Sequence, residues 1–288
     1  MMMRFGPAGN SDSFSQQGKR GNPDVPDYLC EFGLNAYEYQ CGHGVRLNEK
    51  AGREFGKRAQ EKDIALSLHS PYYISLSSPD ADKRAGSVNY ILQSARAVDI
   101  LGGNRIVVHS GSVGKRDREE ALALAKATLK EAQAVLDQEG YSRVVICPEV
   151  MGKVGQLGAL EEVIELCKVD ERMLPCVDFG HLNARTNGSL VKREDFERVL
   201  NSIEKHLGNE RMRKLHIHFS KIEYTEAGGE KRHLTFEDKT YGPAFEPLAE
   251  VLADKGCEGV LICESAGTQA EDARTMMNIY EGVKERAI

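Results

Sequence analysis

The chain has 288 residues, of which 41% are hydrophobic and 28% are charged, a composition typical of globular proteins. Its net charge of −6 provides no broad basic surface for nucleic acid, although bound divalent cations would reverse the sign locally. No run approaches the roughly 20 apolar residues that cross a bilayer, and the opening MMMRFGPAGN lacks the apolar segment of a signal peptide. We therefore expect a cytoplasmic protein with no membrane partner and no nucleotide cofactor.

Short apolar runs alternate with longer amphipathic segments along the chain. Strands are expected near residues 4–6, 35–40, 65–69, 105–109, 144–149, 175–178, 214–218 and 259–264. Between them, segments 80–102, 115–140 and 158–169 carry apolar residues at spacings of three and four, which indicates helices. This alternation predicts an α/β fold, a single (β/α)8 TIM barrel that spans residues 1–288.

Two stretches lack a regular pattern. Residues 11–24 (SDSFSQQGKRGNPD) are expected to form a long loop after the first strand, and residues 224–242 (YTEAGGEKRHLTFEDKTYG) a lid or rim loop after the seventh. The seven cysteines form no CxxC pair, so we expect reduced thiols rather than disulfides or a zinc ribbon.

Acidic or imidazole side chains recur where the apolar runs end. The set comprises His69, His109, Glu149, Asp178, His181, His216 and Glu264. In a TIM barrel the carboxyl ends of the strands meet at one mouth, so these groups would converge there. One such residue alone is more often hydrogen-bonded or solvated, but a buried cluster is costly unless cations compensate its charge. Imidazole and carboxylate are natural ligands of zinc and also suit manganese or iron.

Four further histidines fall outside this set, and one of them, His233, lies in the irregular stretch 224–242. His43 and His206 have no such setting and are expected at the surface. His218 lies two residues beyond His216 and faces the same side of the strand, where three roles stay open: ligand, hydrogen-bond donor to a ligand, or neutral pocket wall. A carboxylate such as Glu149 can bridge two cations, between which a water would be largely deprotonated near neutral pH.

The ordered motifs HSPYY, VVHSG, a Glu ending the fifth strand, VDFGH, HIHFSK and ICES occupy residues 65–265. Together they resemble the endonuclease IV group of apurinic/apyrimidinic endonucleases, within the xylose isomerase-like barrel superfamily. The resemblance implies two or three zinc ions. One would be held by His69 and His109, and Glu149 would bridge it to a second. Asp178, His216 and Glu264 would complete the second, and His181 and His233 would hold a third.

The resemblance also implies substrate contacts. Tyr72 and Tyr73 stand where the family inserts side chains into duplex DNA at an abasic site, with packing on the barrel rim as the alternative. Lys221 matches a family lysine that could meet phosphate, and a solvated lysine is the alternative.

The chain departs from the family pattern at several positions. Lys231, with Glu230 beside it, stands where the family has an Asp ligand of the third metal. Residues 236–238 (FED) replace a Gly-Glu-Gly stretch, and His218 replaces an asparagine. In the second-strand loop only Arg46 offers a charge comparable with the family's DNA contacts.

Three functions fit these residues. The first is a phosphodiesterase that cleaves DNA 5′ to abasic sites by attack of a metal-bridging hydroxide, with Glu149 and Glu264 as catalytic carboxylates. The second is a sugar isomerase or epimerase, in which one ion held by Glu149, Asp178, His216 and Glu264 polarises a carbonyl. The third is a barrel that binds a small molecule or partner without turnover. A one-ion isomerase does not require His69, His109 and His181, and the strand ends contain no lysine that could act as its acid or base. Both observations favour the phosphodiesterase.

Overall fold

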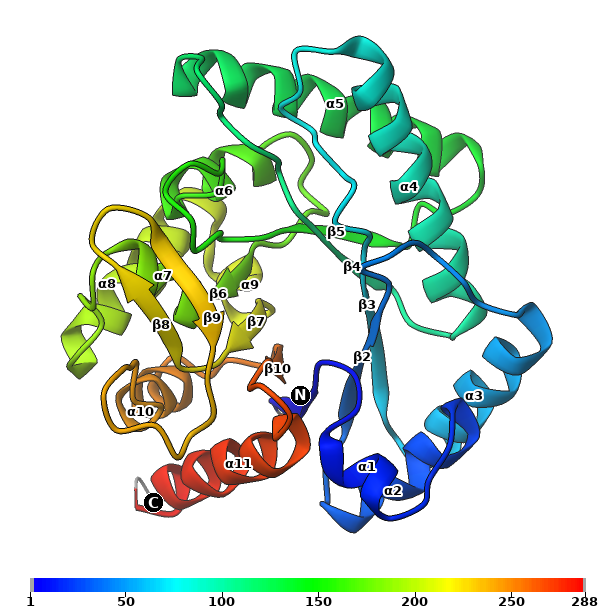
Figure 1. Ribbon diagram of the computed structural model, residues 1–288, viewed down its shortest axis with the longest axis vertical. Helices are drawn as coiled ribbons and strands as arrows, with labels where there is room; N and C mark the ends of the chain where they lie inside the picture. The colour runs from blue at the N-terminus through cyan, green and yellow to red at the C-terminus, as the bar shows by residue number, and fades with distance from the viewer. Residues whose placement is uncertain (1–2, 287–288) are drawn as a thin grey trace.

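The computed structural model describes residues 3–286 and places parallel strands at the centre of a surrounding layer of helices (Figure 1). Two four-stranded parallel sheets have the orders β1-β10-β7-β6 and β2-β3-β4-β5. The strands are β1 (Arg4–Pro7), β2 (Ala36–Gln40), β3 (Ala65–His69), β4 (Arg105–Val108), β5 (Val145–Pro148), β6 (Cys176–Asp178), β7 (His216–Phe219) and β10 (Val260–Cys263).

Single parallel bridges join the two sheets at both seams. One pairs Ala8 with Glu38, between β1 and β2, and the other pairs Glu149 with Cys176, between β5 and β6. The strands therefore succeed one another around a central axis in chain order. The expectation of an α/β protein is confirmed as a TIM-barrel-like fold.

Helical segments alternate with the parallel strands, as the pattern predicted, except that an antiparallel hairpin stands between β7 and the next helix. The helices are α1 (Asp12–Gln16), α2 (Val25–Glu31), α3 (Glu49–Glu61), α4 (Ala81–Ile100), α5 (Arg118–Gln138), α6 (Leu160–Cys167), α7 (Phe179–Arg185), α8 (Arg193–Leu207), α9 (Asn209–Arg213), α10 (Glu246–Asp254) and α11 (Gln269–Arg286). Asp80 and Asp117 cap α4 and α5 by accepting hydrogen bonds from backbone N–H groups of the first turn, which fixes where these two helices begin. No helix in the described part of the chain is long and apolar enough to cross a membrane.

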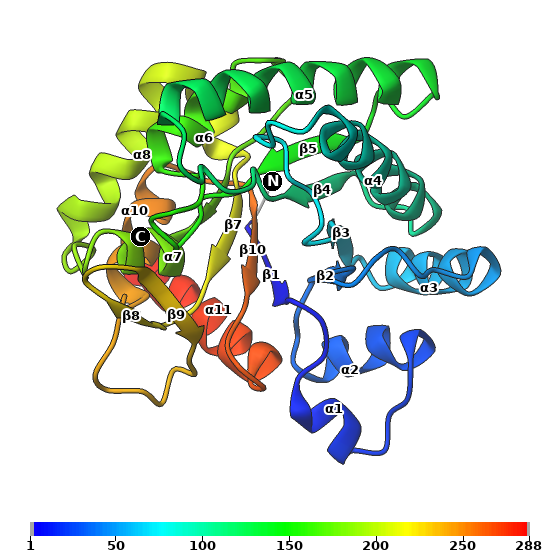
Figure 2. The ribbon, with the colours of Figure 1, turned by 45° about the horizontal axis from the view of Figure 1, so that its top comes forward.

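Both stretches expected to be irregular contain regular structure. Residues 11–24 include α1 and the 3-10 helix η1 (Asn22–Asp24), and α1 is held down by the buried side chain of Phe14. Residues 224–242 include most of an antiparallel hairpin, β8 (Ile222–Thr225) and β9 (Gly229–His233). The hairpin packs beside α7 (Figure 2). These elements are too short to produce a clear hydrophobic period, so the sequence pattern missed them.

Alternate residues of the strands face either an apolar outer layer or an interior in which buried polar groups lie beside two small apolar clusters. In β7, Ile217 and Phe219 belong to the main apolar cluster, whereas His216 and His218 face the interior, where both contact Glu38 of β2. The period of two that defines a strand thus directs polar side chains towards the axis while the helix-facing side stays apolar.

Candidate metal centre

Four groups of side chains in the described part of the chain could hold a cation, because within each group the ligand atoms lie within 4.8 Å of one another. Three of them converge at the carboxyl ends of the strands, and the fourth, Cys176, His216 and His218, reaches one residue pair deeper along β6 and β7. Site 1 comprises His69, His109 and Glu149; site 2 comprises Glu149, Asp178, His218 and Glu264; site 3 comprises His181, Glu230 and His233. Seven of the eight metal ligands expected from the sequence are brought together here, and His216 is the exception.

Glu149 stands at the centre of this arrangement, one residue beyond the end of β5. Its side chain is 1% exposed, and its carboxylate lies 2.9 Å from His109 Nε2, 3.3 Å from His69 Nε2 and 3.2 Å from His218 Nδ1. Burial opposes its ionisation, but the imidazoles of His109, His181 and His218 outweigh burial and hold the pKa of Glu149 well below its usual value. Glu149 is the residue that sites 1 and 2 share.

Three imidazoles are anchored through one ring nitrogen. Nδ1 of His69 is 2.9 Å from the carbonyl oxygen of Ser70, and Nδ1 of His181 is 3.0 Å from that of Val150. Nδ1 of His233 is 2.8 Å from the Ser220 hydroxyl. A carbonyl accepts the N–H of the ring, so the other nitrogen keeps its lone pair for a cation.

Site 2 contains a buried carboxylate oxygen that makes no hydrogen bond within the described part of the chain, although it lies 3.2 Å from Nδ1 of His181. Asp178 ends β6 and caps α7, because its Oδ1 accepts a hydrogen bond of 2.7 Å from the backbone N–H of His181. Its Oδ2 is buried without a hydrogen-bond partner among the described residues. Burial raises the pKa of the nearby Glu264 to about 8, and the charges of Glu149 and Asp178 act in the same direction. A buried oxygen that makes no hydrogen bond, among crowded carboxyl groups, fits a cation.

The structure departs from the expected ligand set at His216. In β7, His218 pairs with Asp178 of β6, whereas His216 pairs with Cys176, one layer deeper. His216 Nε2 is directed to Glu38 at 2.8 Å, so His218 occupies the position in site 2 that was expected for His216. The spacing of the motifs identified β7 as the strand that supplies a ligand, but not which of its two histidines reaches the mouth.

Site 3 contains the carboxylate of Glu230, which lies one residue before the position where the family resemblance places an Asp ligand. In the β8–β9 hairpin, Glu223 pairs with Arg232 and Tyr224 with Glu230, so Lys231 is an extra, bulged residue. A bulge reverses the alternation of side chains, and Glu230 thereby reaches the same face as His233. Glu230 Oε2 lies 3.5 Å from His181 Nε2, while Lys231 pairs with Glu223.

Two glycines allow the hairpin to approach site 3. A Cβ atom on Gly152 would lie 2.5 Å from Glu230 Cβ and 2.9 Å from His181 Cδ2. Gly229 has φ +73°, and a Cβ there would lie 2.2 Å from the Gly152 carbonyl oxygen. The Gly152 oxygen in turn accepts a hydrogen bond of 3.1 Å from Glu230 N. Larger residues would push the hairpin away from His181.

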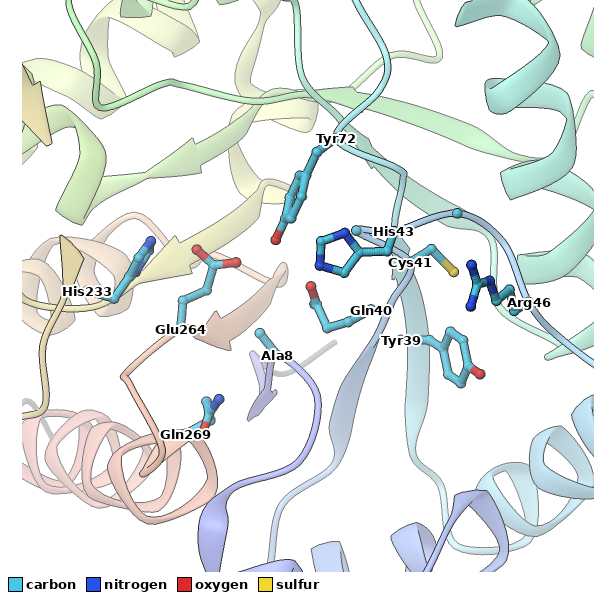
Figure 3. Close-up of a pocket in the computed structure, with 12 residues that line it drawn as sticks. Ala8, Tyr39, Gln40, Cys41, His43, Arg46, Tyr72, His233, Glu264 and Gln269 are labelled. Atoms are coloured by element: carbon cyan, nitrogen blue, oxygen red, sulfur yellow. The ribbon is translucent and has the colours of Figure 1, made fainter. Parts of the chain in front are cut away.

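Tyr72 stands between two cavities at the mouth. A cavity of about 420 Å³ contains residues from all three sites, and a cleft of about 530 Å³ adjoins it. Tyr72, His233 and Glu264 line both (Figure 3). The Tyr72 ring is stacked on His109 at 5.3 Å, and its side chain is 54% exposed. Tyr73 is also exposed, but it packs against Tyr90.

The remaining residues singled out in the sequence lie farther from the sites. Lys221 donates hydrogen bonds to the carbonyl oxygens of Phe236 and Asp238, so its ammonium group fastens the loop after the hairpin and lines neither cavity at the mouth. His43 and His206 are exposed as expected, and His43 and Arg46 line the adjoining cleft.

Comparisons with known proteins agree on the architecture. A family model described as "Xylose isomerase-like TIM barrel" matches residues 26–280. The uncharacterized protein MJ0133 of Methanocaldococcus jannaschii is 32% identical over 284 residues, covering 97% of each chain. The probable endonuclease 4 of Thermotoga maritima is 26% identical over 282 residues, covering 93% of this chain and 95% of that protein. The crystal structure of a D-tagatose 3-epimerase-like protein has a TM-score of 0.71 at 19% identity, with 99% of each chain covered.

Proposed function

Because this chain belongs to the xylose isomerase-like TIM barrel family and gathers three groups of potential cation ligands, we propose that it is a metal-dependent phosphodiesterase of the endonuclease IV type. Its substrate would be duplex DNA with an abasic site, cleaved on the 5′ side. The observation that carries this proposal is that Glu149 is shared by sites 1 and 2, which a one-cation enzyme does not require. The name of the Thermotoga maritima relative supports the same reading.

The donor set fits divalent cations with imidazole and carboxylate ligands, with zinc first and manganese or iron as alternatives. His69, His109 and Glu149 would hold one ion; Glu149, Asp178, His218 and Glu264 a second; His181, Glu230 and His233 a third. Bound cations would supply the positive charge that activates a water molecule and neutralises a phosphodiester.

The protein's own groups orient and enclose the reacting phosphate. Glu149 and Glu264 both line the cavity of about 420 Å³, so we assign the catalytic carboxylates to these two residues. The anchored rings of His69, His181 and His233 hold fixed directions because each uses its Nδ1 atom for an internal hydrogen bond. A ligand set with fixed geometry needs little reorganisation during the reaction.

Tyr72 is placed to recognise the lesion. Its ring borders both cavities and is more than half exposed, so it can fill the gap left by a missing base. Tyr73, the next residue, is also exposed and would support the widened duplex.

A sugar isomerase or epimerase is the second candidate, and one observation favours it. Site 2 alone supplies three carboxylates and an imidazole, a full ligand set for a single ion that polarises a carbonyl. The similarity to the epimerase-like structure supports the same fold but, at 19% identity, not the activity.

Removing site 1 separates the two functions. The variant His69→Asn/His109→Asn would retain site 2, and His206→Asn, which changes an exposed histidine, is its matched control. Each metal-loaded protein is assayed on duplex DNA with one synthetic abasic residue and on a panel of ketoses. We expect chelator-sensitive cleavage of the duplex by wild type and the control, and none by the double variant. Ketose turnover that survives in the double variant would instead establish the isomerase.

A further inference from the structure

A second polar layer lies directly beneath the metal centre. Glu38 of β2 is fully buried, and it contacts no Lys or Arg side chain among residues 3–286. Its Oε2 is 2.8 Å from His216 Nε2 and accepts a hydrogen bond of 3.0 Å from the Ser67 hydroxyl. Its Oε1 is 3.0 Å from His218 Nε2 and accepts a bond of 3.3 Å from Gln40 Nε2. One carboxylate therefore faces both histidines of β7.

The two histidines differ in what their other nitrogen meets. Nδ1 of His218 is hydrogen-bonded to Glu149 at 3.2 Å and lies 3.4 Å from Glu264, which places it within site 2. Nδ1 of His216 is buried and has no hydrogen-bond partner within the described residues. His218 thus connects Glu38 to the ligands of site 2, whereas His216 belongs only to the deeper group with Cys176.

The contact between Glu38 and His218 is close but not an aligned hydrogen bond, since the Nε2–H direction misses Oε1. Its effect on the ring is electrostatic. A carboxylate offers only lone pairs, so a second lone pair on Nε2 at 3.0 Å would be repelled. Nδ1 is hydrogen-bonded to Glu149 at 3.2 Å, so this nitrogen would exchange its hydrogen for a cation when site 2 is filled. The tautomer with hydrogen on Nε2 then removes the repulsion by Glu38 and leaves the lone pair on Nδ1, the atom that faces site 2.

We propose that Glu38 is a positioning residue for site 2: it fixes the ring of His218 with Nδ1 as the ligand atom and keeps His216 out of the ligand set. This inference rests on the cation sites of the proposed function but not on the reaction that they catalyse. A carboxylate that meets only imidazoles, and no Lys or Arg, is costly to bury, and a cation held through His218 compensates its charge.

The substitution Glu38→Gln tests the proposal because it preserves volume. The Gln amide would present an NH₂ group to Nε2 of one of the two histidines. Because NH₂ is a donor, that histidine would then favour the tautomer with its hydrogen on Nδ1. Zinc and cobalt are titrated into metal-free protein against a chromophoric chelator, and the visible spectrum of the cobalt-loaded form is recorded. We expect roughly 10- to 100-fold weaker binding of one ion, a changed cobalt spectrum, and unchanged binding of the other ions.

Paired variants of β7 complete the experiment. His218→Asn should abolish binding of the same ion, whereas His216→Asn should leave the number of bound ions unchanged. If His216→Asn loses the ion and His218→Asn keeps it, or if Glu38→Gln weakens all ions equally or none, the proposal is wrong. Ions bound as expected by a protein without phosphodiesterase activity would refute the proposed function and leave this inference standing.

A spectroscopic measurement on the wild type tests the proposal even if Glu38→Gln does not fold. Histidine-labelled protein is loaded with zinc, and nitrogen NMR assigns the ring of His218 by its absence in His218→Asn. We expect a protonated Nε2 and a zinc-shifted Nδ1. The reverse assignment would overturn the proposal without any change at Glu38.

Discussion

Replacing Glu149 by Gln should disable two cation sites at once while leaving the fold in place. The carboxylate contacts His109, His69 and His218 and belongs to both site 1 and site 2. The amide has nearly the same volume, so the buried position remains filled. It lacks the negative charge, and its NH₂ group cannot bind a cation.

The magnitude follows from the charge that is removed. Two unit charges about 4 Å apart interact by about 4 kcal/mol at an effective dielectric constant of about 20. A loss of that size weakens binding of an ion roughly 1,000-fold, because about 1.4 kcal/mol corresponds to a factor of ten. Without metal, the variant loses charge-assisted hydrogen bonds but also relieves repulsion with Asp178 and Glu264. We therefore expect its free energy of unfolding to fall by no more than about 3 kcal/mol.

Isothermal titration of zinc into metal-free Glu149→Gln measures the change, and thermal unfolding in chelator measures stability. The matched control is Glu165→Gln, which removes an equally paired carboxylate, bound to Lys126 and Lys168, far from the mouth. The control should bind zinc as the wild type does. Loss of a single ion from Glu149→Gln, with the rest bound at wild-type affinity, would show that Glu149 is not shared.

Three further predictions concern the periphery of the centre. Gly152→Ala should lose the ion of site 3 alone, because the added Cβ would lie 2.5 Å from Glu230. Gly155→Ala is the control, since there is open space around Gly155. Equal zinc content in both variants would contradict the packing argument. Tyr72→Ala should weaken binding of an abasic duplex more than it slows hydrolysis of a small phosphodiester. Tyr73→Ala is measured for comparison. Equal losses of Tyr72→Ala on both substrates would contradict its role in recognising the lesion. Zinc uptake at neutral pH should release protons from Glu264, whose pKa burial raises to about 8, and from His69, whose pKa Glu149 raises to about 8 against the effect of burial. The affinity should therefore rise from about pH 6 to about pH 8. Calorimetry in buffers of different ionisation enthalpy counts the protons, and an affinity that does not change with pH would contradict their assignment.

The strand pattern was predictable because the apolar runs of a parallel barrel are continuous and end in conspicuous polar residues. All eight parallel strands lie within two residues of the expected ranges, and His69, His109, Glu149 and Asp178 lie together as their positions indicated. These residues share one feature: each lies at or just beyond the end of a strand. Their convergence follows from the fold alone.

The rest depended on features that a single sequence does not display. His216 and His218 face the same side of β7, and only the register with β6 decides which one reaches the mouth. Glu230 enters site 3 through a bulge at Lys231, which breaks the alternation on which the comparison with the family relied. Glu38 lies within an ordinary strand, AYEYQ, and nothing in that run indicates that its carboxylate faces two histidines more than 170 residues away.

The number of ions bound per chain tests the central claim most directly. Metal-free protein is loaded with zinc and freed of excess metal by gel filtration. Its zinc content is then measured by inductively coupled plasma mass spectrometry and divided by the protein concentration. We predict at least two zinc ions per chain for the wild type, because sites 1 and 2 share Glu149 and site 3 lies beside them. A single ion per chain at saturating zinc would contradict the shared centre and would favour the one-cation isomerase.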